Sequence, residues 1–61
     1  MNHTEFIFWT EVLKKQQVNL ETRIDNYIST PKSIDLYLIK ASALQITLTA
    51  ERIAALEGVK I

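Results

Sequence analysis

The segment 34–56 has the periodicity of one long helix but carries two apolar stripes, and this feature constrains the fold most. The first stripe comprises Ile34, Tyr37, Ala41, Leu44, Leu48 and Ala55. The second comprises Leu36, Ile39, Ala43, Ile46, Ala50 and Ile53. Each follows the three-and-four spacing that keeps side chains on one helical face. At about 100° per residue, the stripes point in roughly opposite directions. The helix is therefore predicted to have packing partners on both sides.

The N-terminal half has the pattern of an ordinary amphipathic helix over residues 4–28. Its apolar stripe comprises Phe6, Trp9, Leu13, Leu20, Ile24 and Tyr27, and Gln17 interrupts it. Its polar face comprises Glu11, Lys14, Lys15, Glu21, Thr22 and Asp25. Thr4 is the expected N-cap, because a threonine hydroxyl accepts hydrogen bonds from the first free N–H groups.

The segment 29–33 divides the chain, because proline is favoured at the first position of a helix and costly inside one. We predict Thr30 as the N-cap and Pro31 as the first residue of a second helix over 31–57, with Ser33 as the competing cap. Gly58 is predicted to end this helix in left-handed geometry, before a short tail at 58–61. One all-α domain over 1–61 is expected, an antiparallel two-helix hairpin with its turn at 29–30.

The size of this hairpin predicts that it self-associates. A chain of 61 residues buries only about 60% of its unfolded surface, so it needs further stabilisation. The chain has no cysteine and only one histidine, which argues against disulfides and structural metal sites. Oligomerisation remains, and it is expected to complete a four-helix or larger bundle.

The second stripe is the predicted interface: Leu36, Ile39, Ala43, Ile46, Ala50 and Ile53, joined by Phe8 and Trp9. One stripe should pack on the first helix and the other on a partner, although the sequence leaves open which stripe does which. Phe8 and Trp9 belong to a bulky N-terminal block that either seals the end of a bundle or enters a partner's pocket. Gln17 and Arg52 either fix the register of the bundle or lie at its edges.

The residue types present predict no catalytic, cofactor-binding or metal site. No pair of carboxylates falls on an apolar stripe, and one glycine cannot form a phosphate-binding loop. The charge is balanced, with seven basic and seven acidic residues, whereas nucleic-acid binding usually shows a basic excess. The segment 36–50 is too short to cross a membrane, and no secretory signal pattern begins the chain. A cytoplasmic location, or one inside a larger particle, is expected.

Three functional hypotheses follow. The leading one is a non-enzymatic protein that self-associates and acts as an adaptor, regulator or structural subunit. The alternative is an accessory subunit that docks as a hairpin on a larger protein or phage-type particle. The third is a helical bundle that binds RNA through Lys14, Lys15 and Arg23. Short helical hairpins that pair into four-helix bundles are an architectural analogy only, and they imply no particular function.

Overall fold

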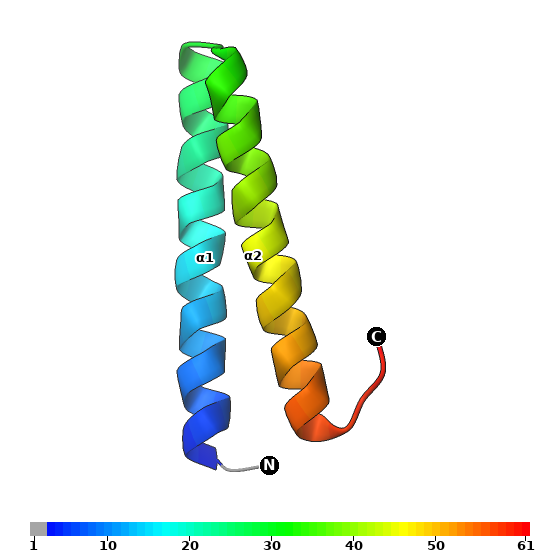
Figure 1. Cartoon of the computed structure of the whole chain (residues 1–61). Helices are drawn as coiled ribbons and strands as arrows, with labels where there is room; N and C mark the ends of the chain where they lie inside the picture. Colours follow the sequence, from blue (N-terminus) through cyan, green and yellow to red (C-terminus); the bar gives the residue numbers. More distant parts are fainter. Residues whose placement is uncertain (1–2) are drawn as a thin grey trace.

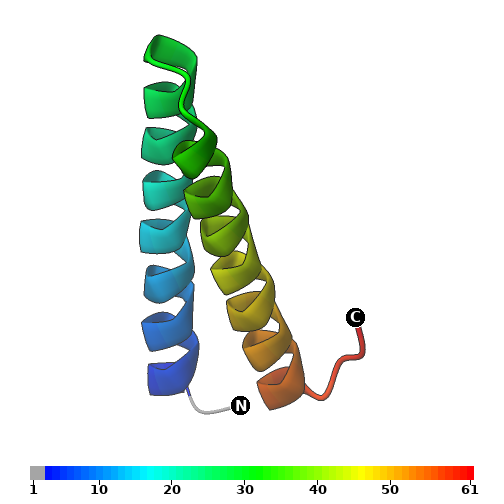
Figure 2. The same cartoon turned by 45° about the horizontal axis from the view of Figure 1, so that its top comes forward.

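The protein is a helical hairpin, seen in a computed structural model that describes residues 3–61. Helix α1 spans His3–Ser29 and helix α2 spans Ser33–Glu57. The two helices run antiparallel, lie closest at their connection and diverge toward their far ends (Figure 1; Figure 2). The predicted all-α hairpin is therefore confirmed. Neither helix combines the length and the apolar character needed to cross a membrane, within the described part of the chain.

The start of α2 differs from the prediction. The helix begins at Ser33, and its N-cap is Lys32, which has extended geometry (φ −134°, ψ 138°) and no side-chain capping bond. The Thr30 N–H still bonds to the Asn26 carbonyl at 2.9 Å, so Thr30 completes the last turn of α1. Pro31 consequently lies in the connection rather than in α2. The first turn of α2 is instead closed by the Asp35 N–H, which donates to the Lys32 carbonyl at 3.0 Å.

The predicted cap of the first helix is also wrong. Thr4 lies inside α1, because the helix already includes His3. A capping residue has non-helical backbone geometry and flanks the helix, so Thr4 cannot be one. The boundaries otherwise agree with the predicted 4–28 to within one residue at each end.

The C-terminal end of α2 forms a Schellman motif, as the glycine predicts. Gly58 is left-handed (φ 74°, ψ 25°). The Val59 N–H donates to the Ala54 carbonyl at 2.8 Å, and the Gly58 N–H donates to the Ala55 carbonyl at 3.3 Å. This pair of bonds satisfies carbonyls that the end of a helix leaves free.

Replacing Gly58 by alanine isolates the backbone cost of this motif. A Cβ at this position would meet no atom within 4 Å, so the cost comes from the positive φ alone. We expect Gly58→Ala to lower the free energy of unfolding by about 1 kcal/mol, measured by urea denaturation followed by circular dichroism. A synthetic chain with D-alanine at position 58 is the matched control and should be at least as stable as the natural chain. Equal loss in both variants would contradict this account.

The two helices meet along a seam with heptad spacing. Its members are buried or half-buried residues at alternating intervals of three and four: Trp9, Leu13, Gln16, Leu20, Arg23 and Tyr27 from α1, and Asp35, Ile39, Ser42, Ile46, Thr49, Ile53 and Leu56 from α2. This spacing is typical of antiparallel helices packed as in coiled coils. Along α2, isoleucines alternate with the small hydroxyl residues Ser42 and Thr49, which allow the helices to approach closely.

The hairpin has almost no interior. It measures 42 × 19 × 11 Å between Cα extents, so it is a single layer of helices. Within the described residues, the buried positions are Ser42, Thr49 and Ala54, and no large side chain is fully buried. Because domains are built from packed layers around a hydrophobic core, one layer leaves most apolar side chains in water.

Candidate functional site

One side of the hairpin, here called the apolar face, carries apolar side chains from both helices, most of them exposed. It contains Phe6, Ile24 and Ile28 from α1 and Leu36, Ala43 and Ala50 from α2. At 100° per residue, all six are rotated from the centre of the seam by about 60° to 110° in the same sense. In an antiparallel pair, this rotation places them on the same side of the plane that holds the two helix axes.

The second stripe borders this face, and α1 covers only part of it. Leu36 is 50% exposed, and Ala43 is exposed as well. The other four members, Ile39, Ile46, Ala50 and Ile53, are half-buried. The second stripe is thus the one nearer to α1, which the sequence left open, and its outer flank remains uncovered. Its role as a subunit interface stays a prediction.

Gln17 lies among the apolar residues of this face, as its place in the α1 stripe predicts. It is exposed, and its Nε2 donates to Glu21 Oε1 at 3.4 Å. The polar residue that enters the seam is instead its neighbour Gln16. Gln16 Oε1 is buried and accepts no hydrogen bond. An unsatisfied buried acceptor normally costs about 1–3 kcal/mol, so Gln16 is an unfavourable residue at this position of the seam.

The opposite side of the hairpin holds a groove between the helices, here called the polar groove. Its upper part, nearer the connection between the helices, is a hollow of about 400 Å³ lined by Gln16, Asn19, Arg23, Ala41, Ser42 and Gln45. Its lower part, of about 450 Å³, is lined by Trp9, Val12, Gln16, Gln45, Leu48, Thr49 and Arg52. Gln16 and Gln45 belong to both linings, so the two parts join into one groove.

Arg23 links the two helices at the upper part of the groove. Its Nη1 donates to the Leu38 carbonyl at 2.8 Å and to Ser42 Oγ at 2.7 Å. Both acceptors are neutral, and Arg23 itself is half-buried. A cation removed from water is best stabilised by an opposite charge, so these two bonds satisfy the hydrogens on Nη1 without neutralising the guanidinium.

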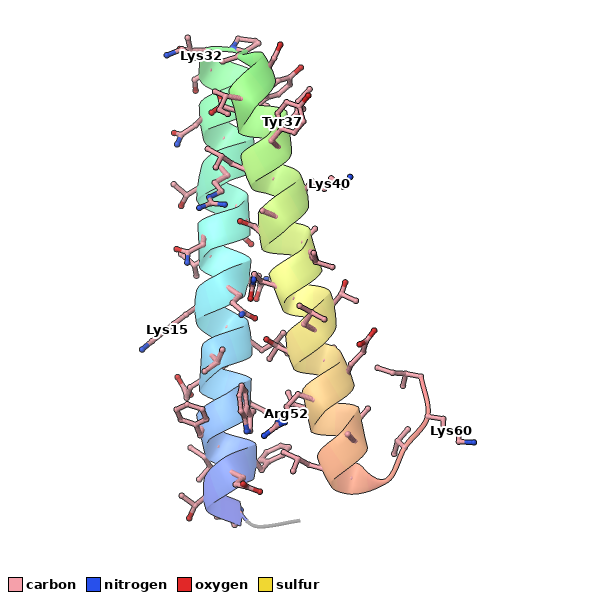
Figure 3. The ribbon with its side chains drawn as sticks, in the orientation of Figure 1. Lys15, Lys32, Tyr37, Lys40, Arg52 and Lys60 are labelled. Carbon is pink, nitrogen blue, oxygen red and sulfur yellow. The ribbon has the colours of Figure 1, made fainter. Side chains whose placement is uncertain are left out.

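Arg52 and the aromatic residues form the lower end of the groove. The Arg52 guanidinium carbon lies 5.3 Å from the Trp9 ring centroid, within the range of a cation–π contact. Phe8 meets Trp9 edge to face, with centroids 5.0 Å apart. In Figure 3 the Arg52 side chain lies between the two helices. Trp9 therefore lines the groove and also belongs to the seam that contains Ile53, and Phe8 lies against its ring.

The first stripe of α2 turns away from α1. Ile34, Tyr37, Leu44 and Leu48 are all exposed, and Tyr37 points outward near the connection (Figure 3). Leu48 lines the groove, whereas Leu44 belongs neither to the groove linings nor to the apolar face. Both stripes of α2 therefore retain uncovered side chains in the single hairpin.

Four functional candidates escaped the sequence reasoning: Gln16, Arg23 in its bridging role, Ser42 and Thr49. A search for apolar residues alone overlooks them. The signal was nevertheless present, because Ile39, Ile46 and Ile53 repeat every seven residues and the matching heptad positions between them are Ser42 and Thr49.

No group of three or more histidine, cysteine or acidic side chains converges on a possible metal position, as far as residues 3–61 are concerned. Comparison with protein-family models, with curated proteins and with solved structures found no match for the chain.

Proposed function

We propose that the protein is a non-enzymatic assembly protein that self-associates through the apolar face, so that two hairpins form a four-helix bundle. The observation that carries the proposal is the lack of any fully buried large side chain within the described residues. A second layer of helices would bury Phe6, Ile24 and Ile28 together with Leu36 and the outer flanks of Ile39 and Ile46. The resulting bundle would act as an adaptor, a regulator or a structural subunit.

The accessible surface area of the hairpin supports pairing with a second hairpin. The chain exposes 4825 Å², whereas a compact monomer of 7.0 kDa is expected to expose about 4,000 Å². The excess of about 800 Å² equals the area that one partner contributes to an interface of standard size, about 800 Å². Pairing through one face is therefore sufficient to bring the exposed surface per chain to that of an ordinary globular protein.

Gln17 supports a specific register for this pairing. It is the polar side chain in the middle of the α1 part of the apolar face, and a lone polar residue in a bundle core fixes register at a cost in stability. Gln17→Leu is expected to strengthen association by about tenfold and to broaden the distribution of oligomers, measured by sedimentation velocity. Thr22→Leu, an exposed polar position of α1 on the other side of the hairpin, is the control and should leave association unchanged. A weaker or unaltered oligomer in Gln17→Leu would place this residue outside the interface.

The direct test is the mass of the natural chain in solution. Sedimentation equilibrium combined with circular dichroism over a dilution series should show a dimer or larger oligomer that loses helicity as it dissociates. A monomer that keeps its full helicity at all concentrations would refute the proposal. A monomer with low helicity would favour the second candidate, a hairpin that folds on a larger partner.

That second candidate rests on the exposed aromatic N-terminus. Phe8 is 57% exposed and lies on the groove side, where a second copy bound to the apolar face would not cover it. Removal of residues 1–9 would then destroy docking without removing α2. The RNA-binding alternative gains less support, because the Arg23 guanidinium already bridges the two helices and does not extend outward beside Lys14 and Lys15.

A further inference from the structure

We infer that the polar groove is a second binding site, and that its ligand is an acidic amphipathic helix of another protein. The inference does not depend on self-association, because the groove and the apolar face lie on opposite sides of the plane of the hairpin. A second copy on one side leaves the other open. The two α2 stripes, which point in opposite directions, would then each have a partner.

The charges of the groove define the sign of the ligand. Arg23 and Arg52 line it, and no acidic side chain appears in either lining. Arg23 bonds only through Nη1 and only to neutral acceptors, so Nε and Nη2 remain to bind a carboxylate. Arginine presents five N–H donors in a planar fork that suits carboxylates. Among the described residues, the linings of the groove therefore carry two guanidinium groups and no carboxylate.

The shape of the groove favours a helix. A channel between two antiparallel helices is the usual seat of a third helix, with an apolar face laid into it. Along α2, Ala41 and Leu48 are seven residues apart, are both exposed and line the groove, so they provide an apolar floor for the incoming helix.

The positions of the two arginines predict the spacing of the ligand's carboxylates. Arg23 is anchored on Ser42, and Arg52 lies ten positions further along α2, a rise of about 15 Å. On an incoming helix, residues about eleven apart are separated by a similar rise and lie on the same face. No two acidic residues of this chain are eleven positions apart. Glu11 and Glu21 are ten apart, but their side chains differ by about 80° in direction around α1, so the expected partner is a different protein rather than another copy.

Trp9, the only tryptophan of the chain, lies in the groove and provides the assay. The probes are synthetic tryptophan-free amphipathic peptides with two glutamates about eleven residues apart, together with versions of other glutamate spacings. We expect the peptide with the matched glutamate spacing to shift the Trp9 emission when it binds and to release heat in titration calorimetry. Binding should weaken with added salt, because part of it is electrostatic.

Arg52→Gln is the variant that tests the contact, since Arg52 is exposed and its loss should not unfold the hairpin. It should weaken the matched peptide about tenfold. Lys40→Gln, which removes a cation that projects away from α1 (Figure 3), is the control and should change the affinity by less than about twofold. A charge reversal completes the test: Arg52→Glu should prefer a peptide in which lysine replaces the facing glutamate.

Two outcomes would overturn the inference. One is no Trp9 response to any peptide of the set, whether or not an RNA oligomer gives a response, and the other is equal affinities of Arg52→Gln and Lys40→Gln for the matched peptide. The mass of each sample is followed by sedimentation. Peptide binding by a monomer would support the groove site and refute self-association. A dimer that binds none of the peptides would support self-association and refute the groove site.

Discussion

Leu36→Asp is expected to weaken self-association by at least about a hundredfold, because each chain would bring a carboxylate into the apolar interface without a partner for it. Leu36 is half exposed in the single hairpin and does not belong to the seam. The substitution should therefore leave the α1–α2 packing intact. Sedimentation equilibrium of the variant should give the mass of a monomer at concentrations at which the natural chain is associated.

Leu44→Asp is the matched control for this experiment. The substitution is the same, and the exposure of the original side chain is nearly equal, 55% against 50% for Leu36. Leu44 lies outside the apolar face, so the variant should associate like the natural chain. Identical behaviour of the two variants would show that the apolar face is not the interface, and loss of association in Leu44→Asp alone would transfer the interface to the first stripe.

Ile46→Asp is expected to have a larger effect, because it acts on the fold as well as on the association. Ile46 is half-buried in the seam. The flank of its side chain that α1 does not cover borders the apolar face. The change removes a large aliphatic contact and places a carboxylate against α1, with a combined cost of about 3 kcal/mol or more. A hairpin of this size has little more stability than that to lose. The variant should be monomeric and largely unfolded at 25 °C.

Circular dichroism of Ile46→Asp and Leu36→Asp under conditions in which both are monomeric separates the two effects. Leu36→Asp should match the helicity of the diluted natural chain, and Ile46→Asp should fall well below it. Ile46→Val, which keeps the seam apolar, should cost only about 1 kcal/mol and remain helical. Equal helicity in Ile46→Asp and Leu36→Asp would mean that Ile46 does not contribute to the packing of the two helices.

The sequence allowed the helices to be predicted well because their signals are local. Heptad spacing, a single proline and a single glycine determine where helices run and stop, and Gly58 adopts the left-handed geometry expected of it. The start of α2 was misplaced by two residues. Pro31 fits the first turn of a helix, but the Thr30 N–H is already engaged by α1, and this competition between neighbouring helices is not visible in the local pattern.

The arrangement of the faces was harder to predict, because it depends on which side chains the partner helix covers. The second stripe was correctly recognised as one face of α2, but its isoleucines serve the seam and the apolar face together. Ser42 and Thr49 are buried although neither is apolar. Small hydroxyl residues of this kind are accommodated by close helix approach, and Ser42 in addition by the Arg23 bond, which joins residues nineteen apart in the chain.

The divergence of the two helices from their connection gives the hairpin a taper, with Arg52 and Trp9 stacked at the wide end. Two tapered layers that point the same way would leave a gap at their wide ends. Two that point in opposite directions fit with constant thickness, each wide end beside the narrow end of the other. Such a pair has twofold symmetry and uses the same patch on both chains, so the apolar face is fully occupied at two copies and cannot add a third chain to start a fibre.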